Sequence, residues 1–66
     1  MVIGIKESSV TKVWHDVTWD QSTGKIEIRY SAETVGIGYA LNREDAVDSA
    51  KAYCSSVGEK FKRKFW

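Results

Sequence analysis

Three side chains are of the types that enzymes use as acids, bases and nucleophiles: His15, Asp16 and Cys54. A histidine paired with a carboxylate can move protons, and a cysteine activated by a histidine can attack a substrate covalently. Successive residues of a strand point to opposite faces, so His15 and Asp16 cannot act as a pair on a strand. Cys54 falls on the apolar stripe of a predicted helix, where a small buried thiol is the simpler interpretation. We therefore predict no catalytic residues and no enzymatic activity.

Metal and phosphate binding lack the motifs that would support them. One histidine, one cysteine and dispersed carboxylates give no spacing of metal ligands. Gly36 and Gly38 form a G-x-G, but no third glycine and no helix start follow it. With Ala40, these glycines leave one face of a predicted strand without bulk, which indicates either a bulged strand or a flat floor for a partner. We expect no metal and no cofactor.

The C-terminal segment 59–66, EKFKRKFW, has the composition of a binding site for nucleic acid. The net charge of the chain is +1, but residues 1–42 and 43–58 are each slightly acidic, so the positive charge is concentrated in this segment. Lysine and arginine bind phosphates, and aromatic rings stack on bases. We therefore predict a small non-enzymatic module that binds nucleic acid, RNA in preference to DNA. The predicted contact residues are Lys60, Lys62, Arg63, Lys64, Trp66, Arg29, Tyr39 and Trp14.

Two alternatives stay open. In the first, Phe61 and Phe65 pack in the core and the cations face water near a helix C-terminus, where the helix dipole favours them. In the second, the chain is a protein-interaction or self-associating module, such as a phage or prophage protein that docks on a host factor. Three tryptophans in 66 residues and a near-neutral charge favour this second alternative, because interface cores are rich in aromatic residues and poor in charge. A homodimer is one form that such a module would take.

Length and composition limit the kind of protein. Sixty-six residues make one small domain, 1–66, and the hydrophobic fraction of 42% is adequate for a core. A single cysteine excludes an intramolecular disulfide and fits a reducing compartment. The N-terminal sequence is too short and too polar for a signal peptide, and no apolar run has the length of a membrane span. A cytoplasmic protein that does not bind membranes is expected.

Alternating apolar and polar residues predict three strands. Residues 10–20 are rich in β-branched and aromatic types, residues 25–31 alternate cleanly, and residues 35–41 form a third strand. Residues 20–25, DQSTGK, have the Asp and Gly of a hairpin loop. The face expected to be buried holds Val13, Val17, Trp19, Ile26, Ile28, Tyr30, Val35, Ile37 and Tyr39, and the outer face holds Trp14, Asp16, Thr18, Lys25, Glu27 and Arg29.

A helix follows the strands. Asn42 suits the N-cap, and Asp45 can reach back to it. The apolar stripe holds Val47, Ala50, Cys54, Val57, Phe61 and Phe65. We expect a break or bend near Ser56–Gly58, with a short second helix after it as one option. The fold class is therefore α+β: an antiparallel meander of three strands, or four if residues 2–5 add an edge strand, with a C-terminal helix bent or broken near Gly58 and packed on one face.

Several motifs together resemble those of the KTSC domain. Ser8-Ser9-Val10 with Val13 is similar to the opening of the family, and Trp19-Asp20 stands where an aromatic residue and an aspartate precede its hairpin loop. Residues 25–30, KIEIRY, are similar to its second strand. Ser56-Val57-Gly58 followed by Phe61 resembles its ending, before a basic stretch and a terminal aromatic residue.

The resemblance covers residues 8–66. It implies a binding function and does not imply a chemical reaction. The KTSC domain occurs at the C-terminus of some lysyl-tRNA synthetases and as stand-alone bacterial and phage proteins. This context implies RNA binding, and no catalytic residues are assigned to the family. Two departures weaken the transfer: the Tyr-x-Tyr of the family appears here as Ile37-Gly38-Tyr39, and Leu41-Asn42 replaces the Val-Pro before its helix.

Overall fold

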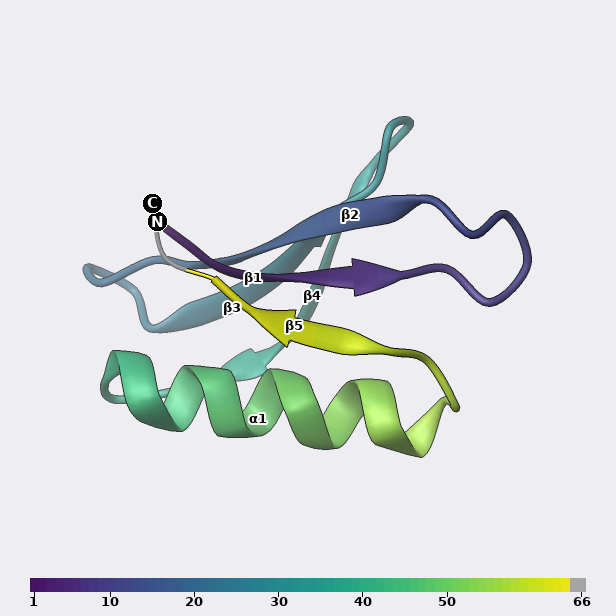
Figure 1. Ribbon diagram of the computed structural model, residues 1–66. Coiled ribbons are helices and arrows are strands. Elements are labelled where there is room, and N and C mark those ends of the chain that lie inside the picture. Colours follow the sequence, from purple (N-terminus) through teal and green to yellow (C-terminus); the bar gives the residue numbers. More distant parts are fainter. Residues whose placement is uncertain (65–66) are drawn as a thin grey trace.

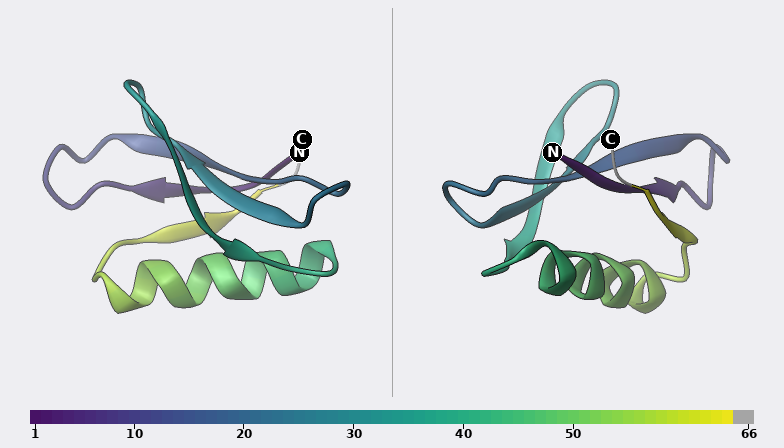
Figure 2. Two further views of the ribbon diagram at one scale, coloured as in Figure 1. Left: turned by 180° about the vertical axis from the view of Figure 1, so that it is seen from behind. Right: turned by 60° about the vertical axis from the view of Figure 1, so that its left-hand side comes forward.

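The computed structural model describes residues 1–64 as five strands and one helix (Figure 1). In chain order the elements are β1 (Val2–Glu7), β2 (Trp14–Trp19), β3 (Lys25–Arg29), β4 (Thr34–Tyr39), α1 (Arg43–Ser56) and β5 (Phe61–Arg63). The strands form one antiparallel sheet in the order β4-β3-β2-β1-β5, and α1 lies on one side of it (Figure 2). This arrangement confirms the α+β class with a meander and a helix packed on one face.

The meander has the four strands given as an option, β1 to β4, and the sheet has a fifth strand that was not predicted. Residues 2–5 do belong to a strand, but β1 is an interior strand between β2 and β5 rather than an edge. The fifth strand comes from the basic segment. It was missed because β5 pairs with β1, more than fifty residues earlier in the chain, so no local pattern marks the pairing.

The hairpin between β2 and β3 forms as the loop sequence predicts. Gly24 has a φ of 79°, in the left-handed region that glycine adopts without strain. Its N–H donates to the carbonyl oxygen of Asp20 at 2.7 Å, and the side chain of Asp20 accepts from the N–H of Ser22 at 2.8 Å. The loop backbone is therefore satisfied by the residue that begins it.

A bulge in β4 corrects the predicted face of Tyr39. Gly36 lies opposite Glu27 and Gly38 lies opposite Ile26, so Ile37 is an extra residue in the strand. A one-residue shift moves every later side chain to the other face. Tyr39 accordingly lies opposite Lys25 on the outer face and is 71% exposed, instead of facing the helix. The bulge itself is one of the two outcomes that the glycines indicated.

The helix begins and ends where the sequence predicts. The side chain of Asn42 accepts from the N–H of Asp45 at 2.9 Å. The helix ends at Ser56, and Gly58 has a φ of 71°, which confirms the predicted break. No second helix follows within the described residues, so placing Phe61 on a helical stripe was wrong. Phe65, the last residue predicted for that stripe, lies outside the described residues, as does Trp66.

The core lies between α1 and the facing side of the sheet. The sheet supplies Ile3, Val17, Trp19, Ile26 and Ile28, and the helix supplies Ala46, Val47, Ala50 and Cys54. Val13 and Val57, which were expected in the core, are 51% and 47% exposed because they lie outside the strands and the helix. Phe61 is half-buried against this core from β5.

Candidate nucleic-acid interface

The basic segment joins the sheet as its last strand, and this places Lys62 on the outer face. Phe61 and Lys62 are neighbours in β5, so their side chains point to opposite sides. Phe61 packs against the core beneath α1, and Lys62 therefore lies on the face that α1 leaves uncovered. There the Nζ of Lys62 is 5.0 Å from the ring centroid of Trp14, which is a cation–π contact.

The backbone pairing extends one residue beyond each end of β5. The carbonyl oxygen of Lys60 accepts from the N–H of Glu7 at 3.0 Å, and the N–H of Lys64 donates to the carbonyl oxygen of Ile3 at 3.0 Å. Strand alternation places Lys60 and Lys64 on the same side as Lys62. Three lysines at two-residue spacing therefore follow this edge of the outer face.

Arg63 does not belong to this row. Its guanidinium Nη2 lies 2.5 Å from Oε1 of Glu44 near the start of α1, on the helix side of the sheet. Both side chains are about half exposed or more. The predicted cation set is thus divided by the alternation of β5, and Arg63 ties the basic strand to the helix instead of facing the outer surface.

The remaining predicted residues lie farther across the outer face. Arg29 is exposed on β3, opposite Asp16 of β2. Tyr39 lies on β4, at the opposite edge of the sheet from β5. Trp66 is outside the described residues. The structure thus brings Trp14 together with Lys62, leaves Arg29 on the interior strand β3, and separates Tyr39 on the opposite edge strand from Lys62.

Carboxylates occupy the middle of the outer face. Glu7 lies opposite Trp14, and Asp16 lies opposite Ile5, the residue that also faces Lys62. Glu27 is 3.7 Å from the Nζ of Lys25, on the same face of β3. The positive charge is consequently a stripe along β5 rather than a field over the whole sheet.

On the helix side, sequence reasoning missed a buried ion pair. Lys6 is 2% exposed, and its Nζ lies 2.6 Å from Oε1 of Glu59, in the turn between α1 and β5. Oε2 of Glu59 accepts from the N–H of Ser9 at 2.8 Å. The alternation in VIGIKE places Lys6 on the same side of the strand as Gly4. However, a lysine after an apolar run is typical of the exposed end of a strand and does not indicate a core residue.

The protonation of this pair is fixed by its contacts. Burial alone would lower the pKa of Lys6, but the hydrogen bond to Glu59 and the nearby Tyr30 outweigh it and raise that pKa above its usual value. The hydrogen bonds from Lys6 and from the N–H of Ser9 lower the pKa of Glu59. Both groups are therefore charged at neutral pH. Since Lys6 is enclosed and already paired, the cluster stabilises the fold and offers no accessible acid or base.

The structure also shows the surroundings of His15, Asp16 and Cys54, the three side chains whose types enzymes use as acids, bases and nucleophiles. His15 lies on the helix side with its ring edge-on to Tyr30, at a centroid distance of 4.8 Å. Asp16 lies on the outer face, so the two neighbours are separated by the sheet. Cys54 is buried, and that burial raises the pKa of its thiol, which disfavours the reactive thiolate.

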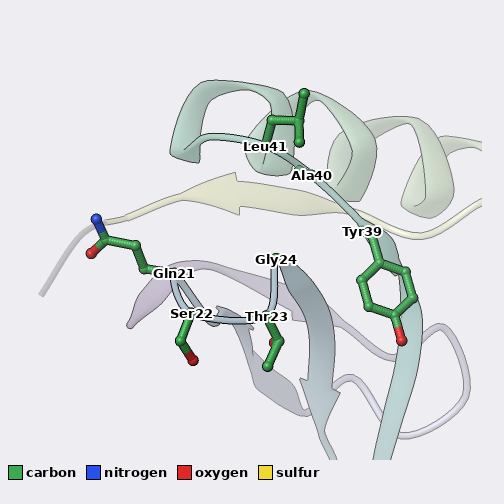
Figure 3. A pocket seen from close by; sticks show the side chains of 7 residues that line it. All are labelled: Gln21, Ser22, Thr23, Gly24, Tyr39, Ala40 and Leu41. Atoms are coloured by element: carbon green, nitrogen blue, oxygen red, sulfur yellow. The ribbon is translucent and has the colours of Figure 1, made fainter.

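Two open depressions flank Leu41, which is 95% exposed. One, of about 310 Å³, lies between the β2–β3 loop at residues 21–24 and the chain at residues 39–41 (Figure 3). The other, of about 530 Å³, is lined by residues that include Met1 and Trp19. Neither is lined by a carboxylate, histidine or cysteine.

The part of the chain that the structure describes contains no group of three His, Cys, Asp or Glu side chains able to hold a metal ion. Within residues 1–64, no helix has the length and apolar character needed to cross a bilayer. No family model matches the chain, and no curated protein and no solved structure shows significant similarity to it.

Proposed function

We propose that the chain is a small non-enzymatic domain that binds single-stranded nucleic acid, RNA in preference to DNA, through the β5 side of its outer sheet face. The observation that carries this proposal is the contact between Lys62 and Trp14. It joins a cation of the basic segment to an aromatic ring on a sheet face that α1 leaves uncovered. Lys60 and Lys64 extend the charge on the same side of the strand.

The charge pattern favours one path for the nucleic acid. A phosphate backbone along β5 would meet Lys60, Lys62 and Lys64, whereas a backbone across the middle of the sheet would meet Glu7 and Asp16 and be repelled. Bases directed from β5 toward β2 would lie over Ile5 and Trp14 and would stack on the indole ring. Carboxylates beside them can accept hydrogen bonds from base amino groups.

Lys62 has two roles in this mechanism. In the free protein its ammonium lies over the ring of Trp14. The side chain is exposed and long, so on binding the ammonium can move to a phosphate and leave the ring to a base. Arg29 would extend the site toward β3, whereas Tyr39 and Arg63 are outside it, the first at the far edge and the second on the helix side.

The preference for RNA rests on the resemblance to the KTSC domain, whose occurrence in lysyl-tRNA synthetases connects it to RNA. That resemblance also favours a bacterial or phage origin, and the single cysteine favours a cytoplasmic location. Membership of the family itself stays a prediction.

Salt titration of binding tests the proposal. Fluorescently labelled single-stranded RNA and DNA of matched sequence, and the RNA duplex, are titrated with the protein from low to physiological ionic strength. We expect single strands to bind more tightly than the duplex, with log K falling against log salt with a slope of about −2 if three lysines each contact one phosphate. Absence of binding at low ionic strength would rule the proposal out, and equal binding of RNA and DNA would rule out the preference for RNA.

A further inference from the structure

The two edges of the sheet differ in charge. The edge formed by β5 carries Lys62 and Arg63, with Lys60 and Lys64 beside them. The edge formed by β4 has the sequence TVGIGY and carries no charged residue. Natural sheets keep foreign strands from their edges with charges, prolines, bulges or cover from another element. The β5 edge has charge, whereas β4 has neither charge nor proline.

The backbone of β4 is accessible on its far side. Its backbone is paired with β3 on one side, and within residues 1–64 no strand lies on its other side. The connection to β3 extends away from the helix, so α1 does not cover the first part of β4 (Figure 2). Gly36 is exposed and has no side chain to shield the neighbouring peptide groups. Unpaired N–H and C=O groups in this form are a template for an added strand.

The bulge at Ile37 protects only part of this edge. Gly38 and Tyr39, which follow it, lie close to where the chain turns into α1. Thr34, Val35 and Gly36 precede it and pair with β3 in regular register. The free segment therefore begins before β4 and runs to the bulge.

We propose that this segment pairs antiparallel with the same segment of a second copy of the chain. Glu33 is the single charged residue between Ser31 and Asn42. A two-fold axis within β4 keeps the Glu33 side chains of the two copies apart, so the pairing opposes no like charges. With that axis perpendicular to the sheet, both helices lie on one side. Val35 and Ile37, which are half-buried at the rim of the core, gain cover from their counterparts.

The dimer is weak. One added strand pair buries less surface than the roughly 1,200 Å² at which stable interfaces begin. Dimerisation is therefore expected at high micromolar to millimolar protein rather than at assay concentrations. This inference is independent of nucleic-acid binding, because β4 and β5 are opposite edges of the sheet.

Sedimentation equilibrium of the protein alone, from micromolar to millimolar concentration, tests the inference. We expect the average mass to rise toward that of a dimer. Thr34→Lys places a charge on the exposed part of β4 of each copy and should weaken dimerisation at least tenfold, whereas Ser49→Lys adds the same charge on the exposed side of α1 and should have no effect.

Amide NMR spectra at low and high concentration identify the surface independently of any substitution. Concentration-dependent shifts confined to residues 33–37 are expected. A monomer at every concentration, shifts located elsewhere, or equal dimerisation of the T34K and S49K variants would each overturn the inference. None of these results bears on the RNA titration, which is done at low protein concentration.

Discussion

The Nζ of Lys6 and Oε1 of Glu59, 53 residues apart in the chain, lie 2.6 Å from each other beneath the end of α1. Lys6 belongs to β1, and Glu59 lies in the turn from which β5 starts. The pair therefore fixes the point at which the basic strand enters the sheet. It connects a buried electrostatic contact on one side of the sheet to the proposed binding surface on the other.

Replacing Glu59 by glutamine should destabilise the domain severely. The variant leaves the ammonium of Lys6 buried without a counter-charge, and breaking such a pair costs about 3 kcal/mol in free energy of unfolding. Glu44→Gln is the matched control, because Glu44 pairs with Arg63 at the surface, where loss of an ion pair costs about 1 kcal/mol or less. Urea unfolding measures both. Equal losses would contradict the larger stabilisation expected from the Lys6–Glu59 pair.

Stability should fall at both ends of the pH range. Glu59 has a lowered pKa in the folded chain, so its contribution is present above the ordinary glutamate pKa of 4.5 and is lost as pH falls through the folded value. Lys6 has a raised pKa, so its contribution is present below 10.5 and is lost as pH rises through the folded value.

Urea midpoints measured across pH for the Lys6→Met variant check these assignments. We expect the urea midpoint of the variant to depend less on pH at both the acid and the alkaline end of the range. The reason is that the substitution removes Lys6 and leaves Glu59 without its ion-pair partner. Asp20 also contributes at acid pH, because its hydrogen bonds with Ser22 lower its pKa. Asp20→Asn should therefore flatten only the acid limb. An unchanged alkaline limb in K6M would contradict the assignment of Lys6.

Gly4 should be intolerant of a side chain. A Cβ at this position would collide with the ring of Phe61 and would lie 2.6 Å from the carbonyl oxygen of Lys62. Gly4→Ala is expected to cost about 2 kcal/mol by overpacking and to loosen β5. Gly36→Ala is the control, because its Cβ would approach only the flexible end of Lys25.

A double-mutant cycle with Phe61→Ala tests the cause of this intolerance. Removing the ring relieves part of the collision, so the G4A/F61A variant should lose less stability than the sum of the two single variants. Urea denaturation provides the three values. Simple additivity would mean that the ring of Phe61 does not determine the need for glycine at position 4.

Binding of single-stranded RNA should depend on Trp14 and Lys62 in different ways. Trp14→Ala removes a stacking surface and should weaken binding by roughly 1 to 3 kcal/mol with little change in salt dependence. Lys62→Gln should reduce the slope of log K against log salt by about 0.7, the value for one phosphate on a single strand. Lys51→Gln, an equal charge change on an exposed position of α1, is the control for net charge.

Anisotropy titrations at several salt concentrations separate these effects, with circular dichroism to confirm that each variant is folded. The same slope for K62Q and K51Q would indicate diffuse attraction and would contradict a defined site on β5.

Local signals were sufficient for the elements that local interactions determine. Asp20 and Gly24 marked the first hairpin, Asn42 marked the start of α1, and Gly58 marked its end, because each acts through backbone contacts within a few residues. The alternation of β2 also placed Trp14 on the outer face.

The features that were not predicted depend on partners distant in sequence. Phe61 fits both a helical stripe and an alternating strand, and only the pairing with β1 decides between them. Lys6 could not be recognised as buried without Glu59 beside it. The contact between Lys62 and Trp14 required both the outer-face position of Trp14, which was predicted, and the strand β5, which was not.

The neighbouring positions of β1 and β5 have a consequence for how the domain can be attached to other molecules. Because these strands are antiparallel, Met1 and Lys64 lie at the same end of the sheet, where the N-terminal amine of Met1 donates to the carbonyl oxygen of Trp19. Trp14 pairs with Glu7 at the other end of β1. A tag or dye fused at the N-terminus would therefore lie close to Lys64 and to the depression that Met1 and Leu41 line, and away from Trp14.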